Sequence, residues 1–317
     1  MTGLALATVE TDLGGALQLG RSALAWTEMH GGALLASASF TARALVLGSL
    51  QRADTLRGRS TARFDAPLAR RHSTGTEAQL DGAVLYHALA LPRVDALFSD
   101  ASARTLLNRN LRAILRGYTA VGVPLRYFGT EVLALLGHPV ALVGYDQAAS
   151  GAVLIEVLIG LENPCVVRSA LERAAPAALY QLLRRTPQAH DLLLSAVAGI
   201  VDRLGATGLD VADSLPPPAS TANCRLPSDN STDAPASVPI PLGVVEAVVD
   251  PALRITGDLL VSRAALARFE QRATETLERG EQLGAELLAP FVGEPLDGAR
   301  PADLLQALQQ AAVTLAR

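Results

Sequence analysis

The sequence predicts an α+β fold, and three observations lead to that prediction. Half of the 317 residues are apolar and only 4% are aromatic. Alanine and leucine dominate, which favours helices packed on a sheet over an all-β sandwich. Short apolar runs bounded by Gly, Pro and Asp predict strands, and longer segments with apolar residues at helical spacing predict helices. The strands cluster, with helices interspersed between them, and this order is typical of an α+β domain.

The first part of the chain predicts one helix followed by strands. Residues 13–30 suggest a helix. ALLASASF (33–40) and ARALVLGSL (42–50) predict two strands, the second buried because it is almost continuously apolar. AVLYHALAL (83–91) predicts another strand.

The middle of the chain predicts helices before and after a strand meander. Residues 100–118 have apolar positions on one helix face. VLALLG (132–137), PVALVGY (139–145) and AVLIEVLIGL (152–161) are short apolar runs separated by Gly, Pro and Asp, which predicts three strands. A second helix is expected at 190–204, ending before Gly205.

A proline-rich stretch divides the chain. Residues 214–243 contain seven prolines among Ser, Asn, Asp and Thr, which predicts a loop or linker. We therefore expect a large domain over 1–213 and a C-terminal accessory segment over 244–317. That segment predicts two strands and then a helix capped by Ser262.

Charge and cysteine usage exclude several classes of partner. The formal net charge is -4 and the pI is about 5.8, so nucleic acid and anionic membrane surfaces are not expected partners. No basic segment followed by an apolar run begins the sequence, and no stretch of 18 apolar residues occurs. Cys165 and Cys224 form no CxxC pair. We expect a cytoplasmic protein with reduced thiols.

All 27 basic residues are arginines, and the chain contains no lysine. The arginine codons of a GC-rich genome account for this bias, but its chemical consequence holds whatever the cause. A Schiff base, a lysine nucleophile and an ammonium clamp are all excluded, because arginine stays protonated and cannot replace an amine. The five histidines include no HxxxH pair, so no metal site is predicted.

The most informative motif is RRHSTGTEAQLDG (70–82), which begins as a loop suited to an anionic small molecule. It lies between LVLGSLQ (45–51) and GTEVLALLGHPVALVG (129–144), and AVLIEVLIG (152–160) follows. In this order the motifs resemble the biotin/lipoate protein ligase superfamily, and its lipoate ligase branch in particular. That branch has VVLGxxQ, then RRxSGGGAVxHD, then G(R/K)ND…GKKIxG and a strand with LxHGT. ITGDLLVSRAALARFE (255–270) resembles the branch's accessory C-terminal segment.

The resemblance implies a fold, a chemistry and a set of site residues. The fold would be a mixed sheet flanked by helices, as in class II aminoacyl-tRNA synthetases and biotin and lipoate ligases, with a small α+β accessory segment. Residues 1–213 would be the catalytic-type domain. ATP would activate lipoate or octanoate as an acyl-adenylate, and a lysine of a lipoyl- or biotinyl-carrier domain would then attack it. The ligand-binding residues carried over are Gly48, Arg70, Arg71, Ser73, Thr74, Gly75 and Asp81.

The match departs from the family at two points that matter for catalysis. Thr76, Glu77 and Ala78 stand where the later loop glycines should be, and Glu77 would repel a phosphate. The family's catalytic lysine position falls on Pro139, or on His138 if the register slips by one. Removing one preorganised donor of this kind costs on the order of 100 to 1,000-fold in rate.

These departures leave three hypotheses open. The first is a degenerate ligase-like protein that binds an acyl-type small molecule or a carrier domain without adenylation. The second is an active lipoyl or octanoyl ligase or transferase that uses Cys165, or an arginine such as Arg71 or Arg126, in place of lysine. The third is an α+β protein-interaction module. For the single residues a further alternative is open under any hypothesis: Arg70 and Arg71 as surface arginines, and Cys165 as a structural cysteine.

Overall fold

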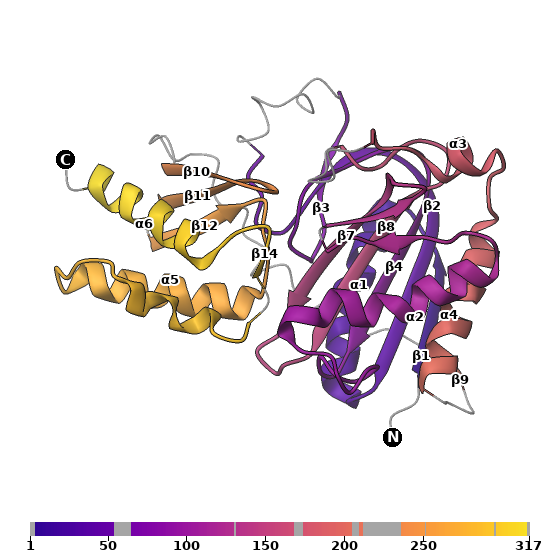
Figure 1. The fold of residues 1–317 in the computed structure, drawn as a ribbon, viewed down its shortest axis with the longest axis horizontal. Coiled ribbons are helices and arrows are strands. Elements are labelled where there is room, and N and C mark those ends of the chain that lie inside the picture. Colours follow the sequence, from indigo (N-terminus) through magenta and orange to yellow (C-terminus); the bar gives the residue numbers. More distant parts are fainter. Residues whose placement is uncertain are drawn as a thin grey trace.

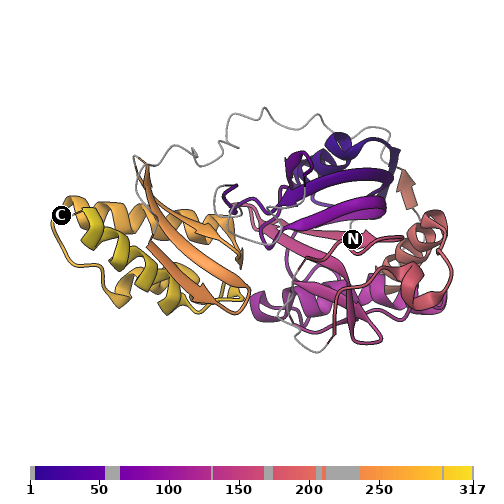
Figure 2. The same cartoon turned by 90° about the horizontal axis from the view of Figure 1, so that it is seen from above.

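The structure is a computed structural model with two α+β units side by side (Figures 1 and 2). The larger unit is built on a wide sheet, and the smaller one is formed by the C-terminal residues. The residues it describes are 4–53, 65–129, 131–167, 174–204, 209–211, 236–250, 252–294 and 296–315.

Nine strands of the described residues form one mixed sheet in the large unit. Its order is β5-β6-β7-β8-β4-β2-β1-β9, and β3 pairs with the C-terminal end of β2. Neighbours from β5 to β2 are antiparallel, whereas β1, β3 and β9 pair in parallel. The strands are β1 (Leu4–Glu10), β2 (Ala33–Leu47), β3 (Leu68–Arg70), β4 (Ala78–Leu91), β5 (Arg126–Tyr127), β6 (Val132–Leu135), β7 (His138–Gln147), β8 (Val153–Gly160) and β9 (Leu209–Val211).

Helices cover both faces of this sheet, which explains why its strands are almost continuously apolar. Leu34 and Ala36 of β2 pack with α1, whereas Ala33 and Leu35 point to the other face and pack with α2 and α4. The helices are α1 (Leu13–His30), α2 (Leu106–Ala120), α3 (Leu179–Leu183) and α4 (Ala189–Leu204).

The predicted break between two strands at residue 41 was wrong, because β2 is continuous. Thr41 pairs with Ala83 and Arg43 pairs with Asp81 on β4, so the ladder runs through the polar positions. Thr41 and Arg43 are exposed, so these polar side chains mark a solvent-facing part of the strand and not a turn. The predicted helices at 13–30 and 190–204 and the meander of β6, β7 and β8 are confirmed.

The C-terminal unit is a small antiparallel sheet, β10-β11-β12, packed against two helices. The predicted cap is confirmed, since the Ser262 hydroxyl accepts the Ala265 N–H at 3.3 Å. The elements are β10 (Ala236–Ile240), β11 (Gly243–Asp250), β12 (Ala252–Gly257), β13 (Leu260–Val261), α5 (Arg263–Glu278), β14 (Leu296–Asp297) and α6 (Pro301–Leu315).

The architecture confirms the predicted class, a mixed sheet flanked by helices with a small C-terminal α+β unit. The domain boundaries stay predictions, because residues 212–235, which include most of the proline-rich stretch, lie outside the described residues. The C-terminal sheet begins at Ala236, inside the predicted linker. In the part of the chain that the structure describes, no helix is both long and apolar enough to cross a membrane.

Candidate functional site

Residues 71–77 connect β3 to β4 and fold into the core; we call this segment, together with Arg70, the RRHSTG loop. Arg71 is 1% exposed, and Ser73, Thr74, Thr76 and Glu77 are equally buried. Loops normally run over the surface, because buried backbone and side-chain polar groups must find partners. A polar loop in the core therefore has to be held by specific contacts.

Backbone hydrogen bonds fix the loop between two strand ends. The Arg71 N–H donates to the Leu47 carbonyl at 2.9 Å, where β2 ends. The Ser49 N–H donates to the Ser73 carbonyl at 2.8 Å, and the Thr74 N–H donates to the Tyr145 carbonyl of β7 at 2.9 Å. The loop thus closes over the ends of β2 and β7, which are not neighbours in the sheet.

The two arginines have separate roles in this arrangement. Arg70 holds the turn after β2, since its Nη1 donates to the carbonyls of Gly48, at 2.8 Å, and Gln51. Arg71 turns into the loop, where its Nε donates to the Ser73 hydroxyl and its Nη2 to the Thr74 carbonyl, both at 3.0 Å. Burial lowers the pKa of Arg71, and the nearby Glu156 carboxylate is the largest opposing influence. The fold therefore brings Gly48, Arg70 and Arg71 together.

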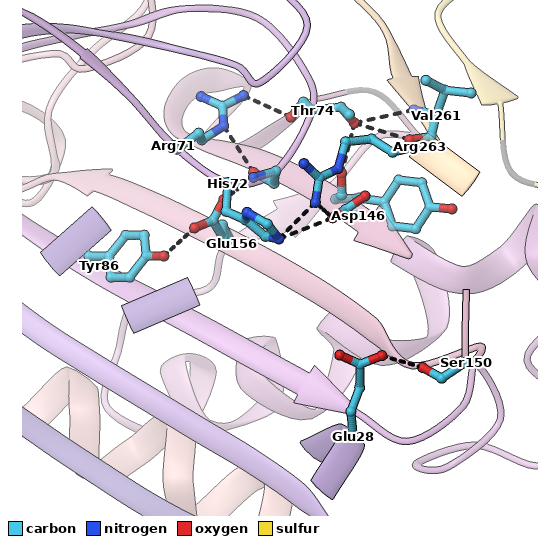
Figure 3. A network of polar contacts seen from close by, with 12 residues as sticks. Glu28, Arg71, His72, Thr74, Tyr86, Asp146, Ser150, Glu156, Val261 and Arg263 are labelled. Atoms are coloured by element: carbon cyan, nitrogen blue, oxygen red, sulfur yellow. Dashed lines mark hydrogen bonds and ion pairs between the residues drawn. The ribbon is translucent and has the colours of Figure 1, made fainter. Parts of the chain in front are cut away.

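Glu156 of β8 lies beneath the loop and joins it to β4 (Figure 3). Its Oε2 accepts the Ser73 N–H at 2.6 Å, and its Oε1 accepts the Tyr86 hydroxyl. Burial raises the pKa of Tyr86 first, and the Glu156 carboxylate adds to the rise. The hydroxyl of Tyr86 is thus kept as a proton donor to the carboxylate.

The C-terminal unit covers the other side of the loop. Gln51 Nε2 lies 2.6 Å from Glu77 Oε2 and 2.7 Å from Asp258 Oδ1. The Val261 N–H donates to the Thr74 hydroxyl at 3.2 Å. Residues from both units therefore share one buried polar network around the loop.

A second connection between the units is ionic. Arg263, the first residue of α5, contacts the buried Asp146 carboxylate of β7 and lies 2.8 Å from His72 Nε2 (Figure 3). Burial, followed by the Arg263 charge, lowers the pKa of His72 to about 3, so this imidazole is neutral at physiological pH. Burial raises the pKa of Asp146, while the Arg263 charge opposes that rise.

Comparison with solved structures identifies the architecture. LipL1 from P. falciparum, in complex with lipoate, matches 98% of this chain and 100% of its own, at 10% identity and a TM-score of 0.61. A lipoate-protein ligase A bound with ATP matches 68% of this chain and 89% of its own, at 16% identity and a TM-score of 0.51. A bipartite lipoate protein ligase from Thermoplasma acidophilum matches 66% and 87%, at 13% identity and a TM-score of 0.52. The chain has the lipoate–protein ligase fold. No protein-family model and no curated protein sequence matches it.

Within this lipoate–protein ligase fold, Asp81 is not brought to the loop. It lies on β4, where it pairs with Arg43 of β2 and is exposed. The Asp81 carbonyl accepts a hydrogen bond from the Asn163 side-chain amide. Asp81 lies within β4, whereas Gly75 lies in the loop before that strand begins. No described contact joins the Asp81 side chain to the other residues assigned with it.

The position of the missing lysine carries no replacement amine. Pro139 is buried in β7 and accepts the Ala177 N–H at 2.9 Å through its carbonyl. His138 Nδ1 lies 2.9 Å from the Ala175 carbonyl, so its ring holds the segment before α3. Arg126 is exposed on β5 at the edge of the sheet. Pro139 and His138 therefore contact backbone segments in the structure.

Cys165 lies in the core next to β7 and β8. Its thiol is 1% exposed and faces the carbonyls of Leu158, at 3.5 Å, and Val140, at 3.6 Å. Burial raises the pKa of this thiol to about 12. Because the thiolate is the nucleophile, this environment disfavours Cys165 as an acyl acceptor.

Several residues of the network were not identified from the sequence. Glu156 and Asp146 are each a lone acid within an apolar strand, which is a detectable signal because such an acid must be paired when buried. Gln51 stands in the LVLGSLQ motif but had no assigned role. Arg263 and Tyr86 have no local pattern that marks them. Among the described residues, no three His, Cys, Asp or Glu side chains gather in a way that could hold a metal ion.

Proposed function

We propose that this protein is a degenerate lipoate ligase-like protein that binds an acyl-type small molecule or the carrier domain that bears it, without adenylating the acid. The observation that carries this proposal is the absence of lysine from a chain with the lipoate–protein ligase fold. Acyl adenylation develops negative charge between the carbonyl and the α-phosphate, and a mobile ammonium suits that charge. Arginine can pair with an anion but is planar and cannot take up the same contacts.

The loop supports the same proposal. Glu77 stands where a glycine would let a phosphate approach backbone N–H groups, and its carboxylate is held in place by Gln51. A nucleotide phosphate entering there would meet a buried carboxyl group instead of backbone N–H donors. An acyl ligand without a phosphate group does not need the backbone N–H groups that Glu77 replaces. The loop is therefore better suited to an acyl ligand than to a nucleotide.

The comparisons support the class of ligand. One solved structure with this fold contains lipoate, and another was described together with its E2 lipoyl domain. We therefore propose lipoate- or octanoate-derived acyl groups as ligands and a lipoyl-type carrier domain as the macromolecular partner. A biotinyl-carrier domain is the second partner to test.

The test measures binding and chemistry separately. The purified chain is mixed with lipoyl or octanoyl compounds, and its thermal midpoint is followed as the ligand concentration rises. A concentration-dependent increase is expected, because a ligand that binds only the folded state stabilises it. In parallel, ATP, octanoate and an apo-carrier domain are incubated with the chain, with a lysine-containing lipoate ligase as the positive control. Pyrophosphate release and carrier acylation at a rate near the control's would contradict the proposal.

The alternative is an active transferase that uses Cys165 or an arginine. The buried, protonated thiol of Cys165 does not favour it. An acyl-thioester on Cys165, detected by intact mass after incubation with an acyl-carrier substrate, would establish this alternative.

A further inference from the structure

The carboxylate of Glu156 occupies a closed site made by other parts of the chain. The side chain is 1% exposed. It accepts one hydrogen bond from the loop, through the Ser73 N–H at 2.6 Å, and one from the Tyr86 hydroxyl (Figure 3). The Arg71 guanidinium, which is also buried, supplies the compensating positive charge.

Helix α1 leaves room for this carboxylate. Gly20 faces it, and a Cβ atom at this position would lie 2.2 Å from Glu156 Oε1 and 2.8 Å from the Tyr86 hydroxyl. Real Cβ atoms do not come that close to oxygen, so any side chain at this position would force the carboxylate or the phenol to move. The space is therefore shaped around a carboxylate and a phenol.

The donors around Glu156 are those of a carboxylate-binding site. Glu156 accepts hydrogen bonds from a backbone N–H and a phenol O–H, and the buried Arg71 guanidinium nearby acts on it through its charge. Ser73 and Arg71 both belong to the loop that we propose holds the acyl ligand. The loop's capacity to bind an acid is thus already used by the chain itself.

We infer that Glu156 is a built-in carboxylate that fills the acid-binding position of the RRHSTG loop, so that the acyl ligand binds with its carbonyl in a neutral ester, thioester or amide linkage and not as a free acid. A free acid beside Glu156 would put two carboxylates side by side in one buried site, where they repel each other, so a neutral carbonyl group is favoured there. The statement about the ligand rests on the proposed function. The occupation of the site by Glu156 stands without it.

The occupation is tested by chemical rescue. Glu156→Ala removes the carboxylate and leaves a vacancy beside Ser73, Tyr86 and Arg71, so its thermal midpoint should fall. Acetate should raise that midpoint along a saturating curve, whereas acetamide and chloride at equal concentration should not. Glu156→Gln fills the same volume and is the matched control, for which acetate should give only the chloride response. An Ala variant that responds equally to acetate and chloride overturns the built-in carboxylate.

The ligand preference is tested with octanoate and octanamide, which share the acyl chain and differ at the head group, a carboxylate in one and a neutral amide in the other. Wild-type protein should bind octanamide more tightly than octanoate. In Glu156→Gln the affinity for octanoate should rise on the order of tenfold, the factor that one unit of pKa represents, and the octanamide affinity should change little. Equal octanoate affinities in the two proteins overturn the preference. This second measurement does not require the Ala variant to fold.

The experiments distinguish failure of the carboxylate site, failure of the ligand preference and failure of the proposed function. If neither octanoate nor octanamide binds any variant, the proposed function and the ligand preference both fail. Acetate rescue of Glu156→Ala would still establish the carboxylate site in that case.

Discussion

Gly48 and Gly75 are in backbone contact across the candidate site: a Cβ atom on Gly48 would lie 2.1 Å from the carbonyl oxygen of Gly75. Gly48 follows β2, and Gly75 adopts a φ of 109° at the centre of the loop. The loop can therefore close over the strand end only because neither residue has a side chain. Gly48 of LVLGSLQ and Gly75 of RRHSTG, 27 positions apart, thus form one close backbone contact that lets the loop pack on the strand end.

Replacement of Gly48 by alanine tests this contact. The obstructing atom is backbone, which cannot rotate away, so the loop itself must move. We expect a loss of about 1–3 kcal/mol in the free energy of unfolding, typical of an overpacked site. Acyl binding should be lost as well. Gly14→Ala is the control, because a Cβ there meets only Asp12 Oδ1 at an ordinary 3.5 Å. Denaturant unfolding measures both variants, and equal stability of the two would argue against the contact.

The order of motifs predicted where the loop would lie but not what would surround it. LVLGSLQ and RRHSTG could be placed next to each other because each is a local pattern that accompanies a strand end. Asp81 was assigned to the loop by counting along the motif. In the structure β4 begins at Ala78, and strand geometry carries Asp81 away from the loop. Counting along a motif fails where an element begins earlier than the motif implies.

The contacts that cover the loop come from residues far away in sequence. Arg263 lies 117 positions from Asp146, and its place at the start of a capped helix gave no indication of that partner. The same is true of Asp258, which reaches Gln51 from 207 positions away. Local periodicity predicts helices and strands, and it carries no information on which buried charges meet. The lone acids Glu156 and Asp146, each within an apolar run, were the site residues whose need for a partner could be read from the sequence.

The acid sensitivity of the fold is predicted from His87, which is fully buried between β2 and α2. Its Nδ1 lies 2.6 Å from the Ser37 hydroxyl, and its Nε2 contacts the Tyr118 hydroxyl. Burial lowers the pKa of His87 from 6.5 to about 3. The unfolded chain therefore binds a proton that the folded protein does not, and stability is lost as the pH falls from 6.5 towards 3. Between pH 7 and 5 this histidine alone should cost about 2 kcal/mol.

His87→Gln should flatten that dependence. Its free energy of unfolding at pH 7 should be lower than that of the wild type, and its further loss between pH 7 and 5 should be smaller by about 2 kcal/mol. Tyr118→Phe is the control, since it removes a hydrogen-bond partner and leaves the buried imidazole in place. Denaturant titrations at each pH supply the values. Parallel curves for wild type and His87→Gln would show that another group dominates the acid sensitivity.

Arg263 is predicted to hold the C-terminal unit against the loop. In Arg263→Ala the buried Asp146 carboxylate loses its charged partner, and we expect a loss of about 1.5–3 kcal/mol in stability. The amides of Thr74 and Val261 should exchange with solvent roughly tenfold faster or more, because both lie where the two units meet. Hydrogen exchange resolved by residue makes the measurement.

Arg268→Ala is the matched control for that experiment. Arg268 also lies on α5 and pairs with Glu294 at 3.2 Å, but it is 51% exposed. Exposed pairs of this kind contribute about 0–1 kcal/mol, so this variant should resemble the wild type. If both variants accelerate exchange at Thr74 equally, the effect belongs to the helix as a whole and not to the pair with Asp146.

The last prediction decides between a structural and a reactive Cys165. With Cys224, which lies outside the described residues, replaced by serine, Cys165 is the single thiol left to react. A pKa near 12, against an ordinary value of 9, leaves about a thousandfold less thiolate at pH 8, and burial blocks access further. The native protein should therefore react with a thiol-specific reagent at least about a thousandfold more slowly than the chain unfolded in guanidinium. Rapid stoichiometric labelling of the folded chain, together with an added octanoyl mass after exposure to an octanoyl-carrier substrate, would instead make Cys165 a nucleophile and restore the transferase alternative.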